Sequence, residues 1–311
     1  MVDAPRRRRV RAALQIALTL VVVLFAARTL WRQWNEVGTL PATWAPRPEW
    51  IVASCVVVLL TYALLIETWR RTLEAWGARV GFADAARVWS ISNLGKYVPG
   101  KIWQLSAMTV MMRQLGVSLV ASGGAAVLIT VANLVAGFAA VLFFGAGAAV
   151  DRPGTSTASA AMLALSTLAL LAAPYVAPRL TAVAGRLSGG RVPLVTVPPR
   201  APWIGAVGCF VAWVAYGAAF RMFTVGVLGH AAGGTAAYVA AFTGSYLLGY
   251  LALFSPGGLG VRELALATAL PALGLATPAE ATVVTVASRL WLTVLEIAPG
   301  LLFLAAGRKR A

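Results

Sequence analysis

The sequence predicts an all-α protein that crosses a membrane several times. Of its 311 residues, 60% are hydrophobic and only 12% are charged, whereas a soluble domain carries about 25% charged residues. The apolar residues occur in long runs, and an α-helix needs about 20 such residues to cross a bilayer. We therefore expect one integral membrane domain over residues 1–311, a polytopic bundle of about eight transmembrane helices.

Eight apolar runs are candidate spans. In chain order they cover residues 12–31, 50–69, 118–149, 158–178, 202–229, 235–254, 258–275 and 280–306. The run at 258–275 is short and contains Pro271, which makes it the least typical span. The first run follows RRRRVR and has no clear A-x-A cleavage site after it, so we expect an uncleaved span and not a signal peptide.

The distribution of cations predicts the orientation. The net charge is +16, and the cations lie mostly in loops beside apolar runs. With the N-terminus in the cytoplasm, twenty cations, Arg262 among them, fall on the inner side and four on the outer side, as the positive-inside rule requires. We therefore expect a multi-pass protein of the plasma or inner cell membrane, with both termini in the cytoplasm. The positive charge then sets the orientation in the membrane and contacts anionic lipids. We therefore expect no nucleic acid as a partner.

Residues 81–113 begin and end on the inner side in this topology. We expect an interfacial amphipathic helix first, and then a segment that enters the membrane at Pro99-Gly100 and returns. Such a re-entrant segment needs a cavity, because irregular backbone at membrane depth must be sheltered from lipid. The alternative is that residues 92–112 cross the membrane completely.

Two Pro-Gly motifs indicate a weak internal repeat. NLGKYVPGKIW covers residues 93–103, and FSPGGLGVRE covers residues 254–263. Each is followed by an apolar helix, a Leu-Gly pair and a long span containing Thr-Val-Ala. We place the first repeat-like half at about 81–150 and the second at about 235–306. In transporters built from repeats, paired Gly/Pro-interrupted segments mark the binding site.

Charge near these motifs favours an anionic ligand. Proline disturbs the helix before it, so the next helix begins with free N–H groups and a positive dipole end that suit a phosphate. Lys96, Lys101 and Arg262 add full charges beside the two motifs. The other reading is that both motifs are ordinary loop–helix junctions.

Ionisable residues inside spans are a second signal. Arg221, Arg289 and Glu296 lie within apolar runs, and Glu263 follows Arg262 at a helix start. A charge at the bilayer centre costs about 2.5–3.5 kcal/mol on insertion scales, so it faces a cavity or a partner. Two interpretations stay open. One is structural pairing of Glu263 or Glu296 with Arg221 or Arg289, and the other is a polar groove in which arginines hold a lipid phosphate while carboxylates meet a cationic or sugar head group.

The motifs resemble those of a known family. NLGKYVPGKIW, RQLGVS, SPGGLGVRE and the late SRLW…APG are similar to the lysylphosphatidylglycerol synthase transmembrane-region family, also called flippase-like proteins, over about residues 10–306. The resemblance implies a helical domain that moves lipids between leaflets. The cargo in its best-known members is aminoacylated phosphatidylglycerol, and in others a polyprenyl-linked or glycosylated lipid. Related sequences often carry a glutamate after the first motif, and ASGGAAVLITVANL has none.

Motif matches and intramembrane charges together give the candidate head-group-binding residues. They are Lys96, Tyr97, Pro99, Gly100, Lys101, Trp103, Arg221, Pro256, Gly257, Gly258, Gly260, Arg262, Glu263, Arg289 and Glu296.

The expected function is a lipid flippase or transporter for an anionic, aminoacyl-, glyco- or polyprenyl-phosphate lipid. One alternative is an accessory subunit of a lipid-modifying synthase or glycosyltransferase. The other is a membrane glycosyltransferase using Glu36 or Glu49, although no DxD motif occurs. Synthase members carry a soluble transfer domain after the membrane part, whereas this sequence stops at RKRA, so we expect no lysyl transfer. We expect no enzyme activity, and no cofactor or metal, because His230, Cys55 and Cys209 show no ligand spacing.

Overall fold

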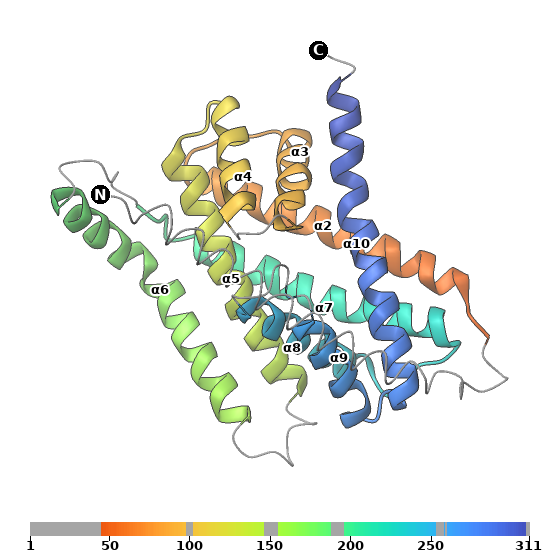
Figure 1. Cartoon of the computed structure of the whole chain (residues 1–311). Helices are drawn as coiled ribbons and strands as arrows, with labels where there is room; N and C mark the ends of the chain where they lie inside the picture. The colour runs from red at the N-terminus through yellow and green to blue at the C-terminus, as the bar shows by residue number, and fades with distance from the viewer. Residues whose placement is uncertain are drawn as a thin grey trace, which may run out of the picture.

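The computed structural model describes residues 45–97, 102–145, 155–187, 196–252, 258 and 260–308, and within these ranges the chain is helical without strands (Figure 1). The α-helices are α2 (Pro48–Ala75), α3 (Phe82–Asn93), α4 (Ile102–Gln114), α5 (Leu119–Gly145), α6 (Thr155–Leu187), α7 (Ala201–Leu228), α8 (Thr235–Leu251), α9 (Val261–Ala272) and α10 (Pro278–Arg308). A short 3-10 helix, η2 (Leu94–Tyr97), follows α3. The all-α prediction is confirmed, and the candidate span at 12–31 lies outside the described residues.

Four helices in the described ranges are long and apolar enough to cross a membrane. They are α2, α5, α7 and α10, with mean hydropathies between 1.6 and 2.4. A rise of 1.5 Å per residue makes them about 40–46 Å long, more than the roughly 30 Å of a bilayer core. The chain is therefore a helical membrane protein, as predicted.

The expected number of eight spans is not confirmed. The predicted span at 258–275 contains only the 12-residue α9, which is about 18 Å long and cannot cross the bilayer core alone. The 17-residue α8 is about 25 Å long. Gly258 and Gly260, which precede α9, have positive φ angles of 69° and 84°, and this conformation delays the start of the helix.

The ends of α2 and α7 follow from local sequence. Each helix has a proline at its first or second position, where the missing N–H has no intrahelical partner to lose. Each ends before a glycine in the left-handed region, Gly77 with φ of 79° and Gly229 with φ of 83°. Glycine adopts this conformation without a side-chain penalty, so both positions suit a helix stop.

Helices α2 and α7 form a long antiparallel pair in the middle of the molecule (Figure 1). At one end, the Arg47 N–H donates to the Gly226 carbonyl at 2.8 Å. At the other end, the Trp76 indole N–H donates to the Thr196 carbonyl. We call these two ends the Arg47 end and the Trp76 end.

Helix lengths follow the order long, short, short, long twice, in α2–α5 and in α7–α10. Helices α3 and α4 pack together and form the first hairpin, and α8 and α9 form the second hairpin. The observed order includes α2 and α7, which the predicted halves at 81–150 and 235–306 left out. Both Pro-Gly motifs lie between the two short helices of a hairpin.

The two hairpins start from opposite ends of the α2–α7 pair. The first joins α2 to α5 at the Trp76 end, where a Cβ on Gly124 of α5 would lie 3.2 Å from the Trp76 ring. The second joins α7 to α10 at the Arg47 end, where His230 Nε2 lies 3.1 Å from Glu280 Oε1. The second half of the chain thus repeats the helix order of the first half with the ends exchanged.

Helix α7 lies at the centre of the packing. A Cβ on Gly217 would come well within 3.0 Å of the α8 backbone at Val239, and one on Gly205 would lie 2.9 Å from Ala132 of α5. Gly208 meets α2 in the same way. Small residues therefore bring α2, α5 and α8 close to α7, as in many membrane helix bundles.

The last part of α10 packs against the first hairpin. A Cβ on Gly300 would lie 2.9 Å from the Ser90 carbonyl oxygen of α3, and Trp291 stacks on Phe223 of α7 with ring centroids 4.5 Å apart. On α3, Ala85 and Val88 are buried, whereas Arg87 is exposed. Helix α10 thus connects the second hairpin to the first.

Candidate functional site

The backbone turns tightly where α9 begins. A Cβ on Gly258 would lie 2.8 Å from the Gly249 carbonyl oxygen, and a Cβ on Gly249 would lie 2.9 Å from Cβ of Arg262. Neither position has room for a side chain. The glycines of the second motif therefore let the end of α8 and the start of α9 touch, and this contact sets the position of Arg262.

Glu263 closes the first turn of α9. Its Oε2 accepts a hydrogen bond from the Gly260 N–H at 2.7 Å, an arrangement that satisfies one of the donors left open at a helix start. The carboxylate also lies at the positive end of the helix dipole. The Gly260 amide is therefore already occupied, so it is not among the free donors that the sequence suggested for a phosphate.

Arg262 is buried, with 4% of its surface exposed. Its guanidinium carbon lies 4.3 Å from the ring centroid of Tyr246 and 5.3 Å from that of Phe242. Both distances are within the range of cation–π attraction. The Gly249–Gly258 contact places Arg262 inside the protein and not in an exposed loop, and the side of the membrane on which it lies stays a prediction.

Arg289 of α10 completes a charge cluster with Arg262 and Glu263. Its Nε lies 3.5 Å from Glu263 Oε1, and the side chains of Arg289 and Glu263 are 21% and 10% exposed. This is one of the structural ion pairs expected from sequence. We call Arg262, Glu263 and Arg289 the α9 charge cluster. Two guanidinium groups and one carboxylate leave it with a net positive charge.

Arg262 retains hydrogen-bonding capacity inside the protein. Its Nη2 is buried and has no hydrogen-bond partner among the described residues. Arg221 of α7 is partly buried, and its Nε is also a buried atom without a hydrogen-bond partner among the described residues. A guanidinium group with unused donors can form charge-assisted hydrogen bonds to phosphate oxygens. The cluster is therefore chemically suited to hold an anion.

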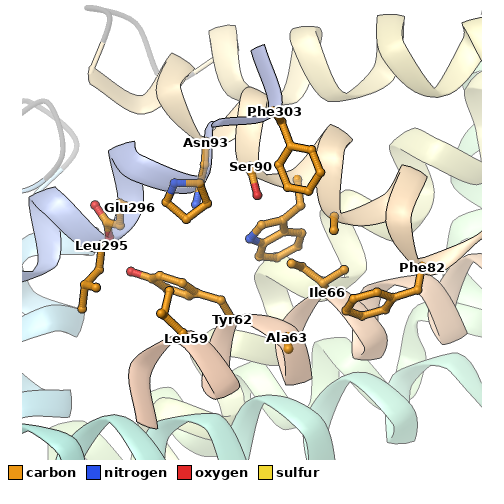
Figure 2. A pocket seen from close by; sticks show the side chains of 13 residues that line it. Leu59, Tyr62, Ala63, Ile66, Phe82, Ser90, Asn93, Leu295, Glu296 and Phe303 are labelled. Carbon is orange, nitrogen blue, oxygen red and sulfur yellow. The ribbon is translucent and has the colours of Figure 1, made fainter. Parts of the chain in front are cut away.

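Glu296 lines a pocket between α2, α3 and α10 (Figure 2). The pocket has a volume of about 160 Å³. Figure 2 shows the Tyr62 hydroxyl on the same side of the pocket as Glu296, with Asn93 and Ser90 above it. Tyr216 of α7 interacts electrostatically with both Glu296 and Arg262, so it is close to the pocket and to the α9 charge cluster.

The first motif can be placed only in part. Lys96 and Tyr97 belong to η2, and Trp103 to the first turn of α4, but their side chains are outside the described part. Pro99, Gly100 and Lys101 of the first motif, and Pro256 and Gly257 of the second, are also outside it. Their roles in lipid binding, and the distance between the two motifs, stay predictions.

Sequence reasoning missed the aromatic residues around these charges. Phe242 and Tyr246 stack on Arg262, and Tyr62 and Trp89 line the pocket. Aromatic residues are common in membrane spans, so their presence alone gave no signal. Cys55 and Cys209 are free thiols, and no group of three or more metal-ligating side chains occurs in the ranges that were described.

Comparison with known protein families gives a match over most of the chain. The family model described as "Lysylphosphatidylglycerol synthase TM region" matches residues 12–300 of this chain. A search of curated proteins gave no match. The matched range contains both Pro-Gly motifs, the α9 charge cluster and Glu296.

Proposed function

Because this chain belongs to the lysylphosphatidylglycerol synthase TM region family, we propose that it is a lipid flippase or lipid-linked-substrate transporter. Its cargo is an anionic phospholipid, an aminoacyl- or glycolipid, or a polyprenyl-phosphate lipid. The observation that carries this proposal is the pair of short-helix hairpins that start from opposite ends of the α2–α7 pair. Transporters with inverted repeats bind their substrates at broken helices of this kind.

Both hairpins are re-entrant in this proposal. Helices α3, α4 and α9 have 12 or 13 residues, so each is about 18–20 Å long and ends inside a bilayer core of roughly 30 Å. The backbone between the short helices would lie at membrane depth, where protein or a polar cavity must shelter it. Helices α7 and α10 pack around the second hairpin and supply that shelter.

The α9 charge cluster supports an anionic head group. Its net positive charge is buried, and Arg262 Nη2 has an unused donor. Burying a charge without a counter-charge costs several kcal/mol, so a bound phosphate would stabilise the cluster. We therefore propose that the lipid phosphate lies within hydrogen-bonding reach of Arg262 Nη2.

The proposed topology puts the Trp76 end in the cytoplasm. Arg79, Arg87, Arg113 and Arg200 are exposed and lie in or next to segments of this end, and cytoplasmic surfaces carry an excess of Lys and Arg. With both hairpins re-entrant, the proposed spans are the run at 12–31 and helices α2, α5, α6, α7 and α10, and both termini stay on the cytoplasmic side of a plasma or inner membrane. The partner is a membrane lipid, a partner synthase or transferase can supply the cargo, and this chain performs no catalysis itself.

Transport by the purified full-length chain tests the proposal. The protein is placed in liposomes with fluorescent phosphatidylglycerol and other labelled lipids, and a membrane-impermeant reductant reports how much label reaches the outer leaflet. We expect faster exchange than in protein-free liposomes, and at least a tenfold loss for Arg262→Met. Arg79→Gln, an exposed arginine outside the cluster, should transport normally. Rates equal to those of empty liposomes for every lipid tested would overturn the proposal.

A second preparation separates transport from an accessory role. If exchange appears only after a co-purified synthase or transferase is added back, the chain is a subunit of that complex. Exchange by the chain alone supports the flippase.

A further inference from the structure

The two hairpins match each other at both ends. Helix α3 begins after Gly81 and α8 begins after Gly234, and both glycines have an extended backbone, with ψ of 149° and 161°. Helices α4 and α9 are each followed by a Leu-Gly pair, in which Gly116 and Gly274 have positive φ angles of 79° and 64°. These four glycines are fixed points from which equivalent positions in the two hairpins can be counted.

Counting from both ends identifies two sets of equivalent residues. Twelve residues after the first glycine of each hairpin stand Asn93 and Tyr246. Twelve residues before the last glycine stand Gln104 and Arg262. Asn93 is therefore the counterpart of Tyr246, and Gln104 is the counterpart of Arg262.

The equivalent residues also contact each other within each hairpin. In the second hairpin, the guanidinium carbon of Arg262 lies 4.3 Å from the ring centroid of Tyr246. In the first hairpin, Gln104 Nε2 donates a hydrogen bond to Asn93 Oδ1 at 2.8 Å. We call Asn93 and Gln104 the amide pair. It occupies the place of Arg262 and Tyr246 in the first hairpin, but it carries no charge.

The amide pair retains hydrogen-bonding capacity. A side-chain amide has two N–H donors and a carbonyl oxygen with two lone pairs. The bond within the pair uses one donor of Gln104 and one lone pair of Asn93, and neither side chain makes another hydrogen bond among the described residues. Both residues are partly buried, and Asn93 lines the pocket shown in Figure 2. The two amides therefore have donors and acceptors left for a ligand.

Helix α10 passes both hairpins near the ends where their short helices meet. At the second hairpin, Arg289 of α10 pairs with Glu263, the neighbour of Arg262. Two turns further along α10, or about 10 Å, Glu296 lines the pocket that Asn93 of the first hairpin also lines. One lipid head group with its glycerol can span that separation. In transporters with inverted repeats the substrate site lies where the repeats meet, so we expect both hairpins to line a single site.

We propose that the amide pair is the uncharged half of the head-group site whose charged half is Arg262. Arg262 holds the lipid phosphate, and the amide pair binds the neutral ester and hydroxyl oxygens beside it, which need hydrogen bonds but no counter-charge. This inference rests on the proposed function and extends its site to the first hairpin. The competing explanation is that the hydrogen bond between Asn93 and Gln104 only closes the hairpin.

Substitutions that change the charge at position 104 separate the two explanations. The full-length protein is placed in nanodiscs of phosphatidylcholine, phosphatidylglycerol with the same acyl chains is added, and native mass spectrometry gives its apparent affinity. We expect Gln104→Glu to weaken phosphatidylglycerol binding about tenfold or more, because a carboxylate repels the phosphate. Gln104→Arg should strengthen it about threefold or more. The same two substitutions at Gln114, an exposed residue of the same helix, should change it less than about twofold.

A second experiment tests whether position 104 faces the same phosphate as Arg262. Arg262→Gln should weaken phosphatidylglycerol binding about tenfold or more, and Gln104→Arg in the same chain should recover about threefold or more, because a guanidinium again reaches the phosphate. Ser106→Arg adds the same charge at an exposed position two residues further along α4, and it should recover nothing. If Arg262→Gln does not fold, the charge series at position 104 decides alone.

Two results would overturn the inference. One is phosphatidylglycerol binding that does not rise from Gln104→Glu through the wild type to Gln104→Arg, which would leave the amide pair as a structural contact. The other is an equal effect at positions 104 and 114, which would reflect a general attraction of anionic lipid. Lipid exchange by the wild-type protein is measured in parallel. Exchange without the charge dependence at position 104 removes only this inference, and charge-dependent binding without exchange removes only the proposed function.

Discussion

The ion pair between Glu263 and Arg289 should show strong energetic coupling. Their charged atoms are 3.5 Å apart, and Coulomb's law gives about 5 kcal/mol for this distance at an effective dielectric constant of 20. Desolvation of both groups opposes this attraction, and Arg289 is one-fifth exposed. We therefore expect a coupling free energy of about 1–3 kcal/mol in a double-mutant cycle.

The two single variants should differ in stability. Glu263→Gln leaves Arg289 without its carboxylate partner and the buried Arg262 in a more positive cluster, so we expect it to lower the free energy of unfolding by about 3 kcal/mol. Arg289→Gln leaves Glu263 with its hydrogen bond from the Gly260 N–H, and Arg289 is itself partly exposed, so its cost should be about 1–2 kcal/mol. The glutamine at 263 can still accept the Gly260 N–H bond, which keeps the helix start intact and isolates the loss of charge.

Unfolding of the purified protein in mixed micelles, titrated with denaturing detergent, measures all four free energies. The distant exposed pair Glu49→Gln and Arg113→Gln is the control and should be additive within about 0.5 kcal/mol. If the Glu263–Arg289 cycle is additive to the same degree, the two side chains do not form the ion pair on which the α9 charge cluster depends.

Three further predictions concern packing, charge geometry and topology. Gly217→Ala should lower the free energy of unfolding by about 1–2 kcal/mol in the same assay, because the new methyl group overlaps the α8 backbone. Gly123→Ala, whose Cβ meets nothing within 4 Å, should be neutral or stabilising by up to about 1 kcal/mol, and equal effects would contradict this packing. Arg262→Lys keeps the charge but loses the planar group over the tyrosine ring, so lipid exchange should fall at least threefold, and a wild-type rate would show that the stacked guanidinium is unimportant. In a cysteine-free background, Gly81→Cys should react with an impermeant thiol reagent only from the cytoplasm and Gly234→Cys only from outside. Labelling of both from one side would disprove the proposed topology.

Hydropathy was enough to predict the long helices. The runs at 50–69, 118–149, 202–229 and 280–306 correspond to α2, α5, α7 and α10, because a span must be apolar over its whole length. The same measure failed at 258–275, where two glycines in the left-handed region shorten the helix. Hydropathy depends only on composition, and both glycine and alanine are compatible with an apolar run. It therefore does not show where a glycine ends a helix.

The candidate site was predictable in its charges but not in its pairing. The sequence offered Glu263 and Glu296 as partners for Arg289, and a spacing of seven residues put Glu296 on the same helix face. The structure pairs Arg289 with Glu263, because α9 packs against α10. The choice depends on how two helices meet, which no local pattern of residues records.

The pocket around Glu296 was beyond sequence reasoning for a related reason. Glu296 and Asn93 are about two hundred residues apart in the chain, and they share a pocket because α10 reaches α3. Gly300 permits that approach. A single glycine in an apolar helix is unremarkable in sequence, so nothing identified it as the contact point between the first and second halves.

The glycines on α7 bear on how the molecule can move. Surfaces without interlocking side chains let rigid helices slide with little repacking, which is the basis of shear motion. Helix α7 presents such surfaces to α2, α5 and α8, which come from both halves of the chain. A small shift of α7 along its axis would therefore displace the helices that flank both hairpins at the same time. Large side chains at these glycines would therefore be expected to trap one conformation even where the protein still folds.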